Sequence, residues 1–263
     1  MEWLQAVFLA LIQGICEFLP ISSSGHLILP SALLGWDDQG LAFDVAVHVG
    51  SLAAVVVYFR QDLLAVVRGG LGTLAGRRSE SGRLAWMLVV ATIPVLVFGF
   101  LFEGFIEQNL RSAQVIAYAT IIGAVFLAVS DHWNAQNKEI AEMTLALALI
   151  IGLAQAAALV PGTSRSGATI TMALLLGFSR TSAARFSFLL SVPVILAGGT
   201  WQTLGLMGES EVPWALIGVA TLVSGISAYI CIHFFLKFIE KIGMMPFVVY
   251  RILLGILLFV FVA

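Results

Sequence analysis

The chain has 263 residues, of which 60% are hydrophobic and 11% are charged. An ordinary soluble domain carries about 25% charged residues, so this composition excludes a typical soluble globular protein and indicates a membrane protein. The formal net charge of −2 says little about partners, and we expect no nucleic acid among them.

Ten apolar segments follow one another, and a helix needs about 20 apolar residues to cross a hydrocarbon core of about 30 Å. Two segments, 23–34 and 165–177, are too short to cross. Short helices at membrane depth are tolerated where protein covers them or where they line a cavity. Each is therefore predicted to form a re-entrant hairpin with the helix before it. The segments are 2–18, 23–34, 43–59, 84–102, 113–130, 143–160, 165–177, 185–204, 213–236 and 246–263.

The two halves of the sequence resemble each other. "QGICEFLPISSSGHLI", which begins at Gln13, matches "QAAALVPGTSRSGATI", which begins at Gln155. Residues 43–50 match 186–193, about 143 positions later. The alternative is chance similarity between membrane segments rich in glycine and serine. An internal repeat is the simpler account.

The basic residues predict the orientation. Loops on one side of the predicted helices carry ten of them, whereas the opposite loops carry only Arg111. The positive-inside rule places the ten in the cytoplasm and both termini outside. The ten are Arg60, Arg68, Arg77, Arg78, Arg83, Lys138, Arg180, Arg185, Lys237 and Lys241.

These patterns predict an all-α polytopic membrane protein with a single membrane domain over 1–263. Each half has an odd number of crossings, so the repeats, at about 1–130 and 143–263, have inverted topology. We expect about six spanning helices plus two re-entrant helix hairpins. In such proteins, broken helices from the two halves tend to meet near the midplane and to aim their N-termini at an anionic ligand.

Each copy of the repeat contains such a break. Pro20 ends the first helix, and Ser22, Ser23 and Ser24 can cap the next one. In the second copy Pro161 and Gly162 break the helix, and Thr163 and Ser164 stand at the new N-terminus. Free N–H groups and a positive dipole end then face a cavity.

Arg165 follows directly. The sequence indicates that it is the one full positive charge inside the apolar region and away from a helix end. Two helix N-termini and a guanidinium make a phosphate site. The first copy also holds Glu17 and His26, which permit proton transfer, nucleophilic attack or metal ligation. The alternatives are serines that serve packing and a Glu17–Arg165 pair that is purely structural. Asp44 shares a helix face with His48. It is either a helix N-cap or a residue that binds the metal or supports one of its ligands.

The two motifs, "QGICEFLPISSSGH" and "PGTSRSGAT", resemble the signature regions of the undecaprenyl pyrophosphate phosphatase family of the BacA or UppP type. The similarity extends to "FDVAVHVGSLAAVVVYF" and "ARFSFLLSVPVILAGG". The resemblance implies hydrolysis of undecaprenyl diphosphate to the monophosphate, which recycles the cell-wall lipid carrier and is associated with bacitracin resistance. It also implies a divalent cation, Mg²⁺ or Ca²⁺, which we expect the substrate to hold for the most part.

Matching residues then carry predicted roles. Glu17, Ser23, His26 and Arg165 are the candidate catalytic residues, and Glu17 is the candidate metal ligand, with Gln13 or Asp44 as a second. The family pattern is Glu/Gln-x-x-x-Glu, and many members have glutamate where this chain has Gln13. His48 stands where glutamine is expected. The candidate phosphate-binding residues are Gln13, Ser22, Ser24, Gly25, Thr163, Ser164, Ser166 and Gly167.

The expected partners are a polyprenyl diphosphate and membrane lipid, with a homodimer as one option for assembly. We expect the chain in the bacterial cytoplasmic membrane, with the site open to the outer side and laterally to lipid. A transporter or flippase of lipid phosphates is the rival interpretation, because transporters also use inverted repeats.

Overall fold

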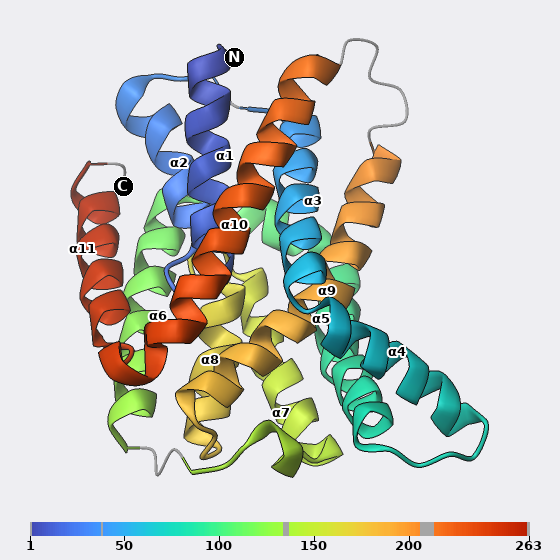
Figure 1. Ribbon diagram of the computed structural model, residues 1–263. Coiled ribbons are helices and arrows are strands. Elements are labelled where there is room, and N and C mark those ends of the chain that lie inside the picture. Colours follow the sequence, from blue (N-terminus) through green and yellow to red (C-terminus); the bar gives the residue numbers. More distant parts are fainter. Residues whose placement is uncertain (1, 38, 134–136, 206–212, 262–263) are drawn as a thin grey trace.

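The computed structural model describes residues 2–37, 39–133, 137–205 and 213–261, and within them it contains helices and no β-strand. Figure 1 shows these helices as one bundle. The α-helices are α1 (Trp3–Phe18), α2 (Ser23–Leu34), α3 (Leu41–Tyr58), α4 (Arg60–Leu74), α5 (Glu80–Asn109), α6 (Ala113–Trp133), α7 (Leu145–Ala156), α8 (Arg165–Leu175), α9 (Arg180–Gly205), α10 (Trp214–Ile242) and α11 (Met245–Phe261). Short 3₁₀ turns, η1 (Ile140–Glu142) and η2 (Ala157–Leu159), flank α7.

Five described helices, α3, α5, α6, α9 and α10, are long and apolar enough to cross a membrane. The last helix, α11, has 17 residues, which at 1.5 Å per residue is about 26 Å and lies at the short end of the spanning range. The all-α polytopic architecture is therefore confirmed. The inverted repeat itself stays a prediction.

Two helical hairpins approach the middle of the bundle from opposite ends. In Figure 1, α1 and α2 occupy the upper half, whereas α7 and α8 occupy the lower half. The first hairpin packs through α1 on α10, and the second packs through α7 on α5. A Cβ atom on Gly14 would stand 2.4 Å from the Ser224 carbonyl oxygen, and one on Gly152 would stand 2.4 Å from that of Ala91. Glycine thus lets each hairpin dock closely on its long helix.

The connections that carry basic residues lie at one end of the bundle. Figure 1 shows the α4–α5, α8–α9 and α10–α11 connections at the bottom, and the N-terminus and the start of α10 at the top. This arrangement agrees with the grouping of loops used for the charge count.

The segment between Arg60 and Arg83 was expected to be a loop, and this was wrong, because α4 (Arg60–Leu74) fills most of it. The helix carries apolar residues both on the side that packs on α5 and on an exposed side. Val66 is buried, and α4 packs on α5. A second apolar stripe remains exposed on α4, at Leu64, Val67, Leu71 and Leu74.

Candidate active site

Both helix breaks have the same backbone geometry. Ser22 and Ser164 are the N-caps of α2 and α8, with φ of 72° and 70°. Such positive φ values are uncommon for residues other than glycine and cost energy, so they are found where the surroundings impose them. Each serine hydroxyl accepts a hydrogen bond from the backbone N–H three residues on, at Gly25 (3.4 Å) and Gly167 (3.1 Å). The predicted capping of both helices is confirmed.

The tip of the first hairpin contacts the start of α8 through an ion pair. Arg165, the first residue of α8, places Nη2 3.0 Å from Oε1 of Glu17. The two side chains are 13% and 8% exposed. Arg165 also donates to the carbonyl oxygens of Ser187 (3.2 Å) and Glu17 (3.4 Å). These contacts hold the guanidinium between the two hairpins. From the sequence, this pair was named only as the structural alternative, and it leaves the functional roles of both residues as predictions.

Gln13 lies one turn before Glu17 on α1 and is fully buried. Its Nε2 donates to Oε2 of Glu17 at 2.9 Å. Its Oε1 has no hydrogen-bond partner among the described residues. A buried acceptor without a partner is unusual in a folded protein and calls for an explanation, such as an ion.

His26 is fixed by two hydrogen bonds. Its Nδ1 lies 2.7 Å from the Ser22 carbonyl oxygen, and its Nε2 lies 2.6 Å from the Tyr250 hydroxyl. The two rings are stacked, with centroids 5.4 Å apart. Because a carbonyl oxygen only accepts, Nδ1 carries the hydrogen, and in the neutral ring Nε2 accepts from Tyr250. Sequence reasoning missed Tyr250, which is 224 residues from His26.

The other predicted phosphate-binding residues surround the two N-termini. Ser23 is the first residue of α2 and is partly exposed. Ser166 donates to the Leu19 carbonyl oxygen at 2.8 Å, and its hydroxyl lies 3.2 Å from that of Ser164. The side chain of Ser24 lies outside the described part of the structure.

A second buried arginine ties the breaks together. Arg251, on α11, is 0% exposed. Its Nε donates to Thr120 (3.1 Å), its Nη1 to Pro20 (3.3 Å), and its Nη2 to Gly162 (3.2 Å) and Thr163 (2.9 Å), in each case to the carbonyl oxygen. No described carboxylate forms a salt bridge with it. Arg251 therefore positions the backbone of both hairpin tips.

This arginine corrects the sequence analysis, which took Arg165 as the one full positive charge in the apolar interior. Arg251 is a second one, and it is the more buried. A Cβ atom on Gly167 would stand 2.5 Å from Nη1 of Arg251. The glycine predicted to bind phosphate thus also leaves room for this side chain.

Asp44 and His48 lie one turn apart on α3. Asp44 accepts a hydrogen bond from Gln39 at 3.1 Å through Oδ1. The His48 Nδ1 lies 2.7 Å from the Asp44 carbonyl oxygen, and its Nε2 lies 3.7 Å from Oε2 of Glu17. The His48 ring therefore approaches Glu17, and the metal role of Asp44 stays a prediction.

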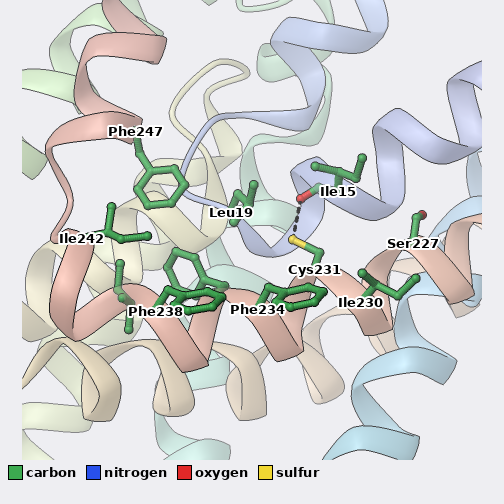
Figure 2. A pocket seen from close by; sticks show the side chains of 11 residues that line it. Ile15, Leu19, Ser227, Ile230, Cys231, Phe234, Phe238, Ile242 and Phe247 are labelled. Carbon is green, nitrogen blue, oxygen red and sulfur yellow. Dashed lines mark hydrogen bonds between the residues drawn. The ribbon is translucent and has the colours of Figure 1, made fainter.

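An apolar groove of about 490 Å³ lies between the end of α1 and the second half of α10. Figure 2 shows its lining by Ile15 of α1, by Leu19, which directly follows α1, and by Phe234 and Phe238 of α10. Neither Glu17 nor Arg165 lines it. The groove is suited to hydrocarbon, and the charged groups described above form a separate site.

The arrangement is suited to binding a phosphate. Two helix N-termini contribute N–H groups, and Arg165 contributes a full positive charge beside a carboxylate. The described residues contain no group of three or more His, Cys, Asp or Glu side chains that could hold a metal. A cation at Glu17 would therefore take further ligands from Gln13, substrate and water, and the partnerless Gln13 Oε1 fits such an ion.

Comparison with known proteins agrees with this geometry. A family model described as bacitracin resistance protein BacA matches residues 6–257. An undecaprenyl-diphosphatase from Saccharophagus degradans is 60% identical over 262 residues, covering 100% of this chain and 99% of the relative. Proteins of the same name from Teredinibacter turnerae (58% identical, 99% of each chain) and Alcanivorax borkumensis (53%, 100% of each) are also similar. The chain belongs to the BacA family.

Proposed function

We propose that this chain hydrolyses undecaprenyl diphosphate to undecaprenyl phosphate and inorganic phosphate. The relatives that match this chain over 99–100% of their own length are named undecaprenyl-diphosphatase. The bond broken joins the terminal phosphorus to the bridging oxygen, which leaves with the lipid monophosphate. Water supplies the oxygen that the released phosphate gains. The observation that carries the proposal is the buried Glu17–Arg165 pair between two helix N-termini.

Arg165 and the two N-termini hold the diphosphate in this proposal. Phosphoryl transfer gains most of its rate from positioning and from fixed positive groups around the transferred phosphoryl. Arg165 is held in place by Glu17 and by the Ser187 carbonyl oxygen. A guanidinium with five donors can keep these contacts and still bind phosphate oxygens.

Ser23 is the better candidate for the attacking group. Both ring nitrogens of His26 already have partners, Ser22 and Tyr250. Ser23 occupies the first position of α2, as Arg165 does in α8, so its hydroxyl stands beside N–H groups that favour an anion. His26 then orients the start of α2, and Glu17 acts as the base or as a cation ligand.

A trapped intermediate tests this assignment. Purified protein mixed with the C55 diphosphate and Mg²⁺, then quenched in acid, is expected to carry an acid-stable phosphoserine. The Ser23→Ala variant should form none and should lose about 10²-fold or more in kcat, because the attacking hydroxyl itself is removed. A His26→Ala variant that still forms the phosphoenzyme is the matched control.

Two other results would contradict the assignment. Phosphate release by wild type with no phosphoenzyme after either an acid or an alkaline quench would favour water as the nucleophile. A phosphoenzyme that survives only the alkaline quench and is absent from His26→Ala would assign the attack to the histidine. If wild type released no phosphate at all, the hydrolase proposal itself would be wrong.

The proposed cation is Mg²⁺ or Ca²⁺, held by Glu17, by Gln13 and for the most part by the diphosphate. Hard cations prefer oxygen ligands, and Mg²⁺ keeps several waters. When bound, such an ion supplies charge neutralisation for the phosphate oxygens. The cation is not required to hold Arg165, whose partners are all protein groups.

The chain spans the membrane several times, and in the proposal it spans the cytoplasmic membrane of bacteria with its site open to the outer side. The catalytic residues Glu17, Ser23 and His26 lie on the hairpin that shares an end with the N-terminus. The positive-inside rule assigns that end to the outside. The prenyl chain stays in the bilayer, and only the diphosphate enters.

Thiol labelling of intact cells tests the orientation. In a background with Cys16 and Cys231 replaced by alanine, a Ser23→Cys variant should react with a membrane-impermeant reagent added outside, and inorganic pyrophosphate should slow the reaction. Glu107→Cys and Arg77→Cys, both at exposed positions, are the outer and cytoplasmic controls. Labelling of Ser23→Cys only after permeabilisation, in parallel with Arg77→Cys, would reverse the orientation.

A further inference from the structure

The His48 side chain presents a nitrogen lone pair to Glu17. Its Nδ1 lies 2.7 Å from the backbone carbonyl oxygen of Asp44, which can only accept, so Nδ1 carries the hydrogen. In the neutral ring Nε2 then has no hydrogen, and this atom lies 3.7 Å from Oε2 of Glu17. Histidines that bind metals nearly always donate their other ring N–H to a carboxylate, a backbone carbonyl or water. His48 has this arrangement.

The facing atoms are two electron-pair donors. A separation of 3.7 Å suits two ligands of one ion, since metal–nitrogen and metal–oxygen bonds are each about 2.0–2.6 Å long. Oε1 of Glu17 is already paired with Arg165, which leaves Oε2 for the ion. The His48 side chain is 33% exposed, so the protein leaves space beside it for an ion and for the substrate.

Gln13 supplies a third donor. Its amide lies 2.9 Å from the same oxygen of Glu17, and its carbonyl oxygen is buried without a partner among the described residues. The oxygen and nitrogen of an amide are assigned from their surroundings. With a cation present, the oxygen is the atom that would turn toward it.

We propose that His48 is a ligand of the divalent cation, binding through Nε2 beside Oε2 of Glu17, with the Gln13 amide oxygen as the third protein ligand. Substrate phosphates and water complete the coordination. This inference rests on the proposed function, since it assigns a ligand to that site's cation. A nitrogen ligand widens the range of metals accepted, because imidazole suits borderline ions such as Zn²⁺ whereas Ca²⁺ prefers oxygen.

Pulsed electron paramagnetic resonance of bound Mn²⁺ tests the ligand without turnover. Purified protein with Mn²⁺ and inorganic pyrophosphate should show ¹⁴N modulation from a directly bound imidazole together with ³¹P coupling. The His48→Gln variant should keep the ³¹P coupling, lose the ¹⁴N modulation and bind Zn²⁺ about tenfold or more weakly, since loss of even an outer partner of a metal ligand costs about 10–100-fold. His132→Gln, at an exposed position on α6, should match wild type.

Each other outcome overturns the inference. Equal Mn²⁺ spectra for wild type and His48→Gln would remove His48 from the coordination sphere. Absence of any bound Mn²⁺ with pyrophosphate would show that these three side chains make no cation site. Phosphate release from the C55 diphosphate with Mg²⁺, measured separately, reports on the proposed function. Activity with no nitrogen signal therefore rejects the ligand and leaves the hydrolase in place.

Discussion

Replacing Arg165 with alanine is expected to lower kcat for the C55 diphosphate by about 10²–10³-fold, the usual effect of removing one preorganised donor from a transition state. Arg165 is a full charge, and it stands where the tips of two hairpins meet. Charge that develops on the transferred phosphoryl would then lose the guanidinium and be left with the N–H dipoles and the proposed cation. The effect should appear mainly in kcat, because the charge grows as the bond breaks.

The same change leaves Glu17 buried without its cationic partner, which also destabilises the fold. Thermal unfolding in detergent therefore accompanies the kinetics. Arg185→Ala is the control, because Arg185 is an arginine of α9 whose ion pair with Asp62 is 42% exposed on each side. It should change kcat little. An Arg165→Ala protein that unfolds earlier but hydrolyses at the wild-type rate would make the pair purely structural.

Arg165→Lys refines this prediction. Lysine keeps the charge but carries it as a point, without the planar fork that reaches two partners. Arg165 now contacts both Glu17 and the Ser187 carbonyl oxygen. We expect an activity between those of wild type and the alanine variant. Activity of the lysine variant as low as that of alanine would show that geometry matters more than charge.

The parts of the structure that depend on local sequence could be predicted. Proline and glycine break a helix wherever they stand, and a serine just beyond them caps the next helix. The segments after Pro20 and Gly162 were identified as hairpin partners by their short length. Ser22–Ser24 and Thr163–Ser164 were the candidate caps, and the structure selects Ser22 and Ser164. A Glu17–Arg165 pair could be named only as an alternative, on the ground that ionisable groups in an apolar interior tend to pair with one another.

Contacts that depend on packing could not be predicted. Tyr250 and His48 meet the site only because α11 and α3 pass beside the hairpins, and nothing near them in the sequence indicates this. Arg251 lies within a helix whose other residues are mostly apolar. One signal for Arg251 was available. A lone arginine six positions inside an apolar segment needs internal partners, since it is too far from the helix end to reach water easily.

The prediction for Arg251 follows from those partners. Arg251→Met removes the donors for carbonyl oxygens on three segments, at Thr120, at Pro20 and at Gly162 and Thr163. Each buried acceptor left without a partner costs about 1–3 kcal/mol. The Gly162 carbonyl oxygen keeps the Thr120 hydroxyl as a donor, so we expect a loss of stability on the order of 4 kcal/mol. Arg111→Met is the control. Arg111 is exposed and pairs with Glu107 four residues earlier, so this substitution should lower the free energy of unfolding by less than about 1 kcal/mol.

Arg251 touches none of the proposed phosphate-binding side chains through a hydrogen bond, yet its loss should also reduce catalysis. It holds Pro20 of one hairpin and Thr163 of the other, and a misplacement of about 1 Å between catalytic groups can cost about 10²-fold in rate. Arg251→Lys keeps one charged donor and should recover part of the stability. Because the lysine cannot bond all four carbonyl oxygens at once, its activity should recover less than its unfolding temperature. If Arg251→Lys had the wild-type kcat, a single hydrogen bond from this side chain would be enough to position the tips of both hairpins.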